Sequence, residues 1–401
     1  MKRLIRAAFA AACWLALYQG PSFAAVTKDV TIPFELVNKN IFIQVQVGRS
    51  APLWFVLDTG NKYAVIDLSV AGSLNLEMAD EVPVGGAGKN IITGRLLKNS
   101  PFHVVGLDRF SQPLFLALPL ADLARASGHE FAGALGYDFI SQFVVEVDYI
   151  KQRLILHDKE SFEYHGAGDI LPITFNAAAH PQVHAGVIDS GHAPVDGTFV
   201  LDLGSSAAVI FNTPFVEKQQ FLAGSRPTVP WLEGRGFGGA IDGSVGRIDA
   251  LKLGSFRIAS PVAIFTRCDS GPFASPEAEG NIGAAILEKF KVILDYARNR
   301  IILEPNARFA EPIEYNRSGL SLTTEGDDFK TIKIAAVAGN APASEAGLQA
   351  GDVVSEINGR PATQFTLTQI RSVFKDAKEC DLTIRRGDQR LTVKLRLRRI
   401  I

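Results

Sequence analysis

Two short stretches of the sequence contain almost the same residues. Residues 55–66 read FVLDTGNKYAVI, and residues 199–210 read FVLDLGSSAAVI, 144 positions later. In each stretch an aspartate comes directly after an apolar run, Asp58 in the first and Asp202 in the second. A lone carboxylate is costly to bury at the end of so apolar a segment. The repetition therefore indicates two similar halves that bring their aspartates together.

A second pair of segments supports the same repeat. Residues 136–156 and 283–303 share their Gly, Phe, Val, Asp-Tyr and Arg positions at a spacing of 147 residues. Apolar and polar residues alternate in many short runs, for example over residues 40–47, and this period of two is typical of half-buried strands. The chain is therefore predicted to be mostly β, with one lobe at residues 26–158 and a similar lobe at residues 166–305.

Paired carboxylates have a specific chemistry. Two carboxyl groups in contact share a proton, because both cannot ionise easily side by side. One then serves as an acid and the other as a base, which is enough to activate a water molecule. Gly60 and Gly204 follow the two aspartates and let two turns pack back to back without a Cβ between them. A single aspartate at a strand end is usually only a turn residue, but its duplication favours a catalytic pair of Asp58 and Asp202.

The two blocks, each followed by a glycine-containing element at Gly136 or Gly283, resemble the tandem lobes of a retropepsin-like or pepsin-like aspartic peptidase. The resemblance covers roughly residues 30 to 305. It implies two β-barrel lobes with a cleft between them, in which Asp58 and Asp202 hold the attacking water. It also implies that Gly136 and Gly283 lie in ψ-shaped loops, that peptides or proteins are the substrates, and that no metal or cofactor is needed.

The same family closes a glycine-tipped flap over its substrate. The glycines at positions 85, 86 and 88 are the better flap candidate, and residues 236–239 are their counterpart in the second half. A plain hairpin is the alternative for both clusters. The flap residues expected from the resemblance are Gly85, Gly86 and Gly88.

The sequence departs from the family pattern after the second aspartate. The family has a hydroxyl residue there, which bonds to the backbone of the opposite turn; Thr59 fits this role and Leu203 does not. Ser205 is expected to donate a hydrogen bond to Asp202, and Asn61 to do the same for Asp58. Because Leu203 lacks the hydroxyl, a non-catalytic peptide-binding protein or adaptor of the same fold remains the alternative to an endopeptidase.

The C-terminal part has a different pattern. Residues 341–359 read APASEAGLQAGDVVSEING, and they resemble the core of a bacterial PDZ domain, with residues 385–388 in its closing hairpin. A small α/β PDZ domain is therefore predicted at residues 317–401, with protein C-termini as partners through strand addition. The predicted carboxylate-binding loop contains Gly319, Leu320, Ser321 and Leu322, although the two leucines also suit a core.

The first residues predict export. A basic start is followed by an apolar run that is too short to span a bilayer, and small residues precede Ala25. Residues 1–24 are therefore predicted to be a signal peptide cleaved before Ala25, in a periplasmic or secreted protein, with a membrane anchor as the alternative. No later segment is long and apolar enough to cross a membrane.

Composition and spacing limit the remaining possibilities. The 401 residues carry a formal net charge of −1, so no basic face is predicted for nucleic-acid binding. The seven histidines lack the spacing of metal ligands. Helices are expected only at residues 120–127, 285–290 and 364–376, and the cysteines that follow residue 24, Cys268 and Cys380, are expected in different domains.

Overall fold

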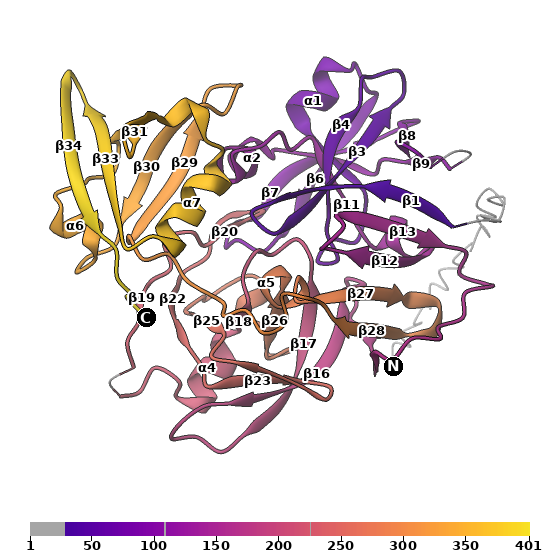
Figure 1. The fold of residues 1–401 in the computed structure, drawn as a ribbon. Helices are drawn as coiled ribbons and strands as arrows, with labels where there is room; N and C mark the ends of the chain where they lie inside the picture. The colour runs from indigo at the N-terminus through magenta and orange to yellow at the C-terminus, as the bar shows by residue number, and fades with distance from the viewer. Residues whose placement is uncertain (1–28, 108–109, 225) are drawn as a thin grey trace, which may run out of the picture.

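The computed structural model describes residues 29–107, 110–224 and 226–401. The predicted signal peptide, residues 1–24, lies outside this part of the chain. The described residues form two β-rich lobes and a separate C-terminal domain (Figure 1). The fold is mostly β, as the sequence predicts.

Lobe 1 is built on one large sheet with the strand order β6-β7-β10-β5-β11-β4-β3-β8-β9, and β2 pairs with β3. Its elements, with the adjoining β1, β12 and β13, are β1 (Val30–Pro33), β2 (Glu35–Val37), β3 (Asn40–Val47), β4 (Leu53–Leu57), β5 (Val65–Asp67), α1 (Leu68–Ser73), β6 (Met78–Val84), β7 (Ile92–Leu97), β8 (Pro101–Val104), β9 (Gln112–Pro113), β10 (Leu116–Leu118), α2 (Ala121–Ser127), β11 (Gly133–Leu135), α3 (Tyr137–Ile140), β12 (Val144–Asp148) and β13 (Arg153–His157).

Lobe 2 repeats this topology with the order β19-β22-β25-β18-β26-β17-β16-β23-β24, and β15 pairs with β16. Its elements are β14 (Asp169–Pro172), β15 (Thr174–Phe175), β16 (Pro181–Ile188), β17 (Val195–Asp202), β18 (Val209–Phe211), α4 (Thr213–Gln219), β19 (Val229–Pro230), β20 (Arg235–Gly236), β21 (Gly239–Ala240), β22 (Gly243–Arg247), β23 (Ala250–Leu253), β24 (Phe256–Ala259), β25 (Val262–Thr266), η1 (Pro272–Ala274), β26 (Gly280–Gly283), α5 (Ala284–Leu287), β27 (Phe290–Asp295), η2 (Tyr296–Arg298) and β28 (Arg300–Pro305).

A six-stranded sheet joins the two lobes. Its order is β1-β13-β12-β27-β28-β14, so the last hairpin of lobe 1 pairs with the last hairpin of lobe 2 through β12 and β27. These hairpins are the second repeated block of the sequence. Their inward-facing residues, such as Val145 and Leu294, are buried in one hydrophobic core that runs through both lobes. The shared core fixes the lobes relative to each other.

The C-terminal domain forms its own sheet, in the order β29-β30-β31-β33-β34, with β32 paired to β31. Its elements are β29 (Leu320–Glu325), β30 (Thr331–Val337), α6 (Pro342–Glu345), β31 (Val353–Ile357), β32 (Arg360–Pro361), η3 (Ala362–Gln364), α7 (Leu367–Asp376), β33 (Glu379–Arg386) and β34 (Gln389–Arg396).

The longest helix, α7, shows why the predicted helical segment folds as it does. Thr366 Oγ1 accepts a hydrogen bond from the backbone N–H of Gln369, and Gln369 Oε1 accepts one from the backbone N–H of Thr366. This capping box starts the helix. Ile370 and Phe374 lie one turn apart and are buried in the core of the C-terminal domain.

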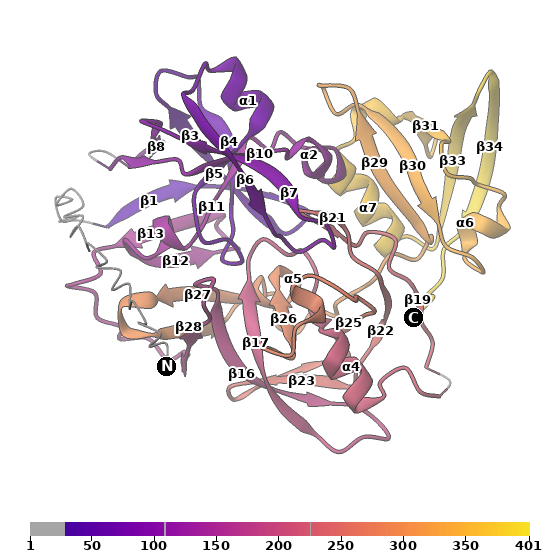
Figure 2. The same cartoon turned by 180° about the vertical axis from the view of Figure 1, so that it is seen from behind.

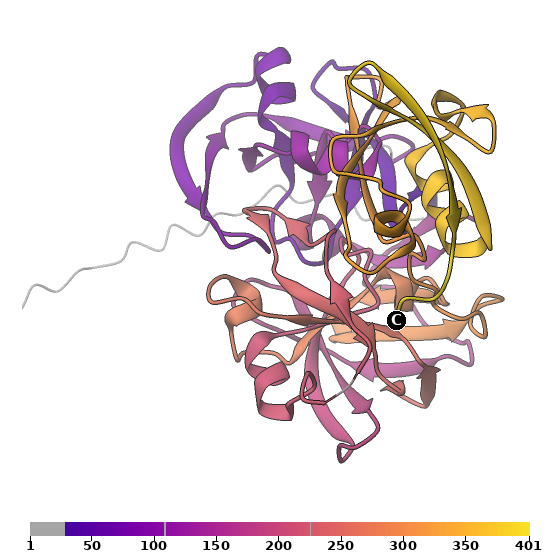
Figure 3. The same ribbon diagram turned by 90° about the vertical axis from the view of Figure 1, so that its left-hand side faces the viewer.

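One carboxylate of the segment between lobe 2 and the C-terminal domain binds arginines of both. Glu314 lies 3.5 Å from Nη2 of Arg317 and 3.9 Å from Nη2 of Arg247, and it accepts a hydrogen bond from Arg399. Burial alone would raise the pKa of Glu314, but the three arginines together hold it below its usual range. Figures 2 and 3 show the C-terminal domain beside lobe 1, with the chain end returning to lobe 2.

The described residues contain neither a membrane-spanning helix nor a cluster of metal ligands. None of their helices is long and apolar enough to cross a membrane. Their histidine, cysteine, aspartate and glutamate side chains form no group of three or more that would suit a metal ion. Cys268 and Cys380 are both free thiols.

Candidate active site

The two aspartates lie at equivalent ends of equivalent strands. Asp58 directly follows β4, and Asp202 is the last residue of β17. In lobe 1, β11 pairs in parallel with β4, and in lobe 2, β26 pairs in parallel with β17. Each of these neighbouring strands supports the aspartate turn of its lobe. The backbone N–H of Asp58 donates to Leu135 O at 2.9 Å.

The glycines of these supporting segments have a steric role. A Cβ on Gly136 would lie 2.3 Å from Asn61 O, and a Cβ on Gly283 would lie 2.4 Å from Ala207 O. Each glycine therefore lets the chain pass directly behind an aspartate turn. Sequence reasoning placed both glycines in this position.

The two carboxyl groups lie near each other across the lobe boundary, close enough for the charge of Asp202 to act on Asp58. A Cβ on Gly60 would lie 3.1 Å from Asp202 Oδ1, and a Cβ on Gly204 would lie 2.4 Å from Asp58 Oδ1. Each glycine thus faces the carboxylate of the opposite lobe. The structure brings together the pair that the sequence repeat suggested.

The environments of the two carboxyl groups differ. Burial and the neighbouring charge of Asp202 raise the pKa of Asp58 to about 7, although the N–H of Gly60 donates to its Oδ1 at 2.8 Å. Burial also raises the pKa of Asp202, but hydrogen bonds from Asn281, Ser205 and Gly204 oppose the increase. Asp202 therefore has more hydrogen-bond donors that favour its charged form than Asp58 has.

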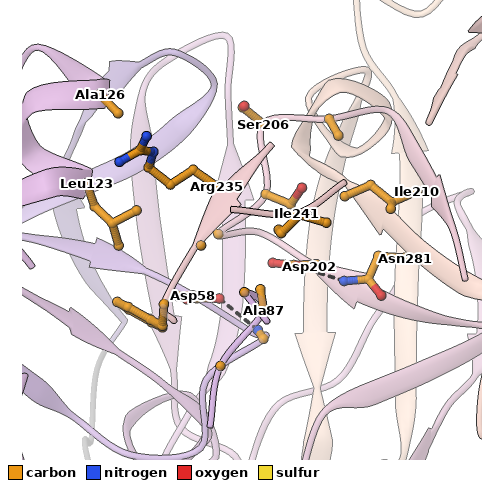
Figure 4. A pocket seen from close by; sticks show the side chains of 18 of the residues that line it. Asp58, Ala87, Leu123, Ala126, Asp202, Ser206, Ile210, Arg235, Ile241 and Asn281 are labelled. Atoms are coloured by element: carbon orange, nitrogen blue, oxygen red, sulfur yellow. Dashed lines mark hydrogen bonds between the residues drawn. The ribbon is translucent and has the colours of Figure 1, made fainter. Parts of the chain in front are cut away.

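Asn281 is a site residue that sequence reasoning missed. Its Nδ2 donates to Asp202 Oδ2 at 2.9 Å, and the two side chains point toward each other (Figure 4). The equivalent position in lobe 1 is Ala134, since Asn281 pairs with Val200 as Ala134 pairs with Val56. A polar residue in an otherwise apolar repeated frame was the available signal.

The predicted support from Ser205 and Asn61 takes a different form. Ser205 contributes to Asp202 through its backbone N–H, and among the described residues no bond from its hydroxyl to Asp202 is present. Asn61 Nδ2 is buried without a hydrogen-bond partner in the described part of the chain. The chain direction of these turns places backbone donors, and not these side chains, against the carboxylates.

The side chain of Thr59 connects the two aspartate turns by hydrogen bonds, and the equivalent residue Leu203 does not. Thr59 Oγ1 donates to Leu201 O at 2.6 Å and accepts from the N–H of Leu203 at 2.9 Å. Leu203 has no hydroxyl to return these bonds, and its side chain is only 1% exposed within the core. The family pattern predicts two hydroxyl bridges between the turns, one from each lobe, which together form a symmetric lock. Only the bridge from Thr59 is present.

A second side chain braces the turn that lacks a hydroxyl. Asn40, the first residue of β3, donates through Nδ2 to Leu203 O at 3.1 Å and to Gly204 O at 2.7 Å. These bonds run from lobe 1 to the turn of Asp202. The turn is thus fixed from two sides, which explains how Leu203 is compatible with an ordered dyad; nothing in the sequence pointed to Asn40.

The two glycine clusters meet tip to tip. Gly88 N donates to Phe237 O at 2.7 Å, and Asn90 N donates to Gly238 O at 3.0 Å. A Cβ on Gly86 would lie 2.4 Å from Phe237 Cβ, so the approach requires glycine. The β6–β7 hairpin and the segment around β20–β21 therefore form a two-part cover, one part from each lobe.

Both aspartates and both hairpin tips line one cavity of about 1550 Å³. Its walls are largely apolar, with Tyr63 and Phe115 stacked at 4.2 Å between ring centroids on the lobe 1 side. Ile210 and Ile264 line the lobe 2 side. A large cavity with largely apolar walls and a few polar groups is typical of a ligand-binding site.

The cavity also reaches the C-terminal domain. Residues 321–325 of β29 and two cations of α7, Arg371 and Lys375, belong to its wall. Of the predicted carboxylate-loop residues, Leu320, Ser321 and Leu322 are buried, the two leucines in the domain core. Gly319 has a φ of +76°, and a Cβ there would lie 2.3 Å from Ala341 Cβ.

Residues 310–385 match the sequence model of the PDZ domain family. The C-terminal domain is a PDZ domain. Over 71% of this chain and 99% of the other, the structure is similar to the aspartic proteinase from Irpex lacteus, with 12% identity and a TM-score of 0.43. It is also similar to Basic 7S globulin from soybean, with 11% identity, a TM-score of 0.39 and coverage of 71% and 97%. No curated protein matches the sequence.

The raised pKa of Asp58 makes a prediction about stability. An unfolded aspartate ionises near 3.8, whereas Asp58 ionises at about 7 in the fold. Between these values the folded protein retains a proton that the unfolded chain releases, so rising pH destabilises the fold. In Asp58→Asn this contribution is absent. We expect the melting temperature of the variant relative to wild type to increase by at least about 3 °C between pH 4 and pH 7.5.

Calorimetry of both proteins across this pH range measures the effect. Asp138 is also buried, and its pKa is raised to about 6, so wild type alone does not isolate Asp58. The difference between the two proteins cancels the contribution of Asp138. Parallel pH curves would show that Asp58 ionises normally in the folded protein.

Proposed function

We propose that the chain is an exported aspartic endopeptidase that hydrolyses peptide bonds with a water molecule activated by Asp58 and Asp202. The proposal rests on one observation: each aspartate faces the turn of the other, and both line the same covered, largely apolar cavity. Two carboxyl groups whose environments separate their proton affinities provide both an acid and a base. The simpler alternative, two turn aspartates with structural roles, does not account for a pair placed at the wall of so large a cavity.

The chemistry follows from the different surroundings of the two groups. The charged carboxylate of Asp202 takes a proton from the water, whose oxygen then attacks the peptide carbonyl carbon. The protonated carboxyl of Asp58 donates its proton to the carbonyl oxygen. Asp202 next gives the proton that it took from the water to the leaving nitrogen as the carbon–nitrogen bond breaks. Asp58 takes a proton from one hydroxyl of the tetrahedral intermediate, which becomes the carboxylic acid product, so that Asp58 is again protonated and Asp202 again charged.

Supporting groups keep these carboxyls in place. Thr59 connects the two turns, and Asn281 holds one oxygen of Asp202. The two hairpin tips exclude water from the cavity once a substrate lies beneath them. Substrate binding therefore requires these tips to separate, since they are hydrogen bonded to each other in this structure.

Peptide cleavage is the direct test. The mature chain from residue 25 onward is incubated with a mixture of peptides between pH 4 and pH 8, and the products are identified by mass spectrometry. We expect cleavage between apolar residues, inhibition by a general aspartic-peptidase inhibitor, and no effect of a metal chelator. Asp202→Asn is the matched control.

The non-catalytic alternative is favoured by Leu203 alone. A peptide-binding protein of this fold would bind the inhibitor, and this binding would slow amide exchange in the flap residues. It would release no cleaved peptide. Tight inhibitor binding without cleavage by wild type at any pH in this range would therefore replace the peptidase with a peptide-binding function.

Asn281 provides a prediction about the pH profile. Asn281→Ala reproduces the residue found at the equivalent position of lobe 1. Without the bond to its Oδ2, Asp202 loses a group that favours its charged form, so its pKa rises. We expect the acidic limb of the kcat/KM profile to move to higher pH by about one unit, because a hydrogen bond to a charged group contributes roughly 1.5–3 kcal/mol.

Measurement of kcat/KM from pH 3 to pH 8 in wild type and Asn281→Ala tests this role. A uniform loss of rate at every pH, with both limbs unmoved, would indicate that Asn281 only maintains the shape of the turn.

Export is a further part of the proposal. The basic and apolar character of residues 1–24 supports removal of this segment before Ala25. We expect N-terminal sequencing of the protein from a periplasmic or medium fraction to begin at Ala25. A membrane-bound form that begins at Met1 would support an anchor instead.

A further inference from the structure

The ligand groove of the PDZ domain lies against lobe 1. Strand β29 is at the edge of the PDZ sheet, and α7 packs beside it. In this type of domain a peptide adds to such an edge strand and lies between strand and helix. Figures 1 and 2 both show α2 of lobe 1 next to β29 and α7, which is where such a peptide would lie.

Side chains of the PDZ domain bind the end of α2. Thr324 Oγ1 donates to Arg125 O at 2.9 Å, and Arg371 Nη2 donates to Ala126 O at 2.9 Å. The last carbonyl groups of a helix have no partner within the helix, so these two bonds satisfy them. Gly128, which ends α2, is so close to α7 that a Cβ on it would lie 2.6 Å from Leu367 Cβ.

The polar groups that a ligand would use are already paired. Arg371 Nη2 also donates to Leu322 O at 3.2 Å. The N–H of Leu320 donates to Ser318 Oγ at 3.1 Å, and Leu320 O accepts from Asn316 Nδ2 at 2.6 Å. One carbonyl of the strand edge and both backbone groups of Leu320 in the predicted loop are therefore bonded from within the chain.

The groove also opens toward the catalytic cavity. Arg371 lines this cavity, and its Nε and Nη1 are buried without a hydrogen-bond partner in the described residues. Lys375 lies one helical turn further on and lines the same cavity, and the charge of Glu233, another residue of the cavity wall, acts on both cations. Buried donors without partners favour the arrival of a carboxylate.

We propose that α2 is an internal occupant of the PDZ groove, and that a peptide strand with a free C-terminal carboxylate exchanges with it and moves the PDZ domain away from the catalytic cavity. The observations that carry this are the bonds from Thr324 and Arg371 to the end of α2. They are two single hydrogen bonds, one from a neutral and one from a charged side chain, and a peptide that makes its own bonds to the groove can replace them. The PDZ domain then remains attached to lobe 2 through Glu314.

Peptide binding to the full mature chain tests the exchange. The probes are fluorescein-labelled octapeptides that end in an apolar residue, each with a free carboxylate or an amide. All proteins carry Asp202→Asn, so that binding is measured without cleavage and does not depend on the proposed peptidase activity.

Gly128→Asn is the opening variant. Asparagine tolerates the left-handed backbone of Gly128, at φ +69°, but its side chain collides with Leu367. Gly48→Asn is the matched control in the same lobe, because Gly48 has φ +57° and a Cβ on it would have no neighbouring atom within 4 Å. We expect Gly128→Asn to bind the carboxylate peptides at least tenfold more tightly than wild type, and Gly48→Asn to bind like wild type.

Hydrogen exchange locates the change. We expect the carboxylate peptide to slow amide exchange in β29 and to speed it in α2 of the protein with Gly128 intact. Equal affinity of Gly128→Asn and Gly48→Asn would overturn the proposal, as would protection of β29 without faster exchange in α2. Failure of every variant to bind the peptides would also overturn it, because the groove would then have no external ligand of this class.

Discussion

Replacement of either Asp58 or Asp202 by asparagine is expected to lower peptide cleavage at least about a thousandfold, within the range found for loss of general acid–base catalysis. An amide neither takes a proton from water nor delivers one to a carbonyl oxygen. Each variant therefore loses one of the two roles, and the remaining carboxyl cannot perform both. The loss should appear in kcat, with a smaller effect on KM.

The fold should survive both changes. The two carboxyl groups repel each other and are desolvated, which is why the pKa of Asp58 is raised to about 7. Removal of one charge relieves this repulsion, so the melting temperature near pH 7 should be unchanged or higher than in wild type. Circular dichroism and calorimetry check this point. Cleavage at a rate near wild type in either folded variant would exclude the shared-water mechanism.

The internal repeat explains how much of the architecture was predictable. Apolar frames around Asp58 and Asp202 repeat because two similar lobes must present the same strand end to a common cleft. Alternation and spacing are local properties, so the β content and the position of both aspartate turns follow from the sequence. The PDZ segment is similarly recognisable from residues 341–359, and its family match covers residues 310–385.

The contacts between the halves were not predictable in the same way. Asn40 braces a turn 163 residues away, and nothing near Asn40 in the sequence marks that role. Asn281 carries a weak signal, since it interrupts an apolar frame, but its partner depends on how β26 lies against β17. Such bonds are set by the packing of two lobes, which a pattern within one lobe does not encode.

The position of the PDZ domain was not predictable from its place in the sequence. Its segment follows the repeat and has its own core, which favours an independent module that recruits substrates. In the structure, residues 321–325 and Arg371 form part of the cavity that contains the dyad. Domain order along a chain does not determine which faces of the domains meet.

Thr59→Val is expected to destabilise the fold by about 2–4 kcal/mol and to lower kcat by on the order of a hundredfold. Valine has nearly the shape of threonine, so the change removes the hydroxyl without leaving a large cavity. Leu203 N then loses its acceptor, and Leu201 O loses the donor at 2.6 Å, both inside the protein. Thr59 is the only hydroxyl at the two equivalent turn positions, because lobe 2 has Leu203 there.

A matched change separates the lock from a general effect of losing a hydroxyl. Thr198 lies on β17, several residues before Asp202, and its Oγ1 makes only a 3.5 Å contact with His184. Thr198→Val should therefore leave both the melting temperature and kcat close to wild type. Thr59→Ser, which keeps the hydroxyl, should restore most of the rate.

The asymmetry of the lock offers a stricter test. In the double variant Thr59→Val/Leu203→Thr the single hydroxyl moves to the other lobe, where by the pseudo-twofold relation of the turns it faces Leu57 O. If one hydroxyl on either turn is sufficient, kcat of the double variant should be at least about tenfold higher than kcat of Thr59→Val, because the catalytic geometry is restored. Leu203→Thr alone should cost about 2 kcal/mol of stability, since it empties buried space filled by a leucine. A double variant that is no faster than Thr59→Val would show that the lock depends on Asn40 and Thr59 acting together on the turn of Asp202, and that the leucine is an integral part of this dyad.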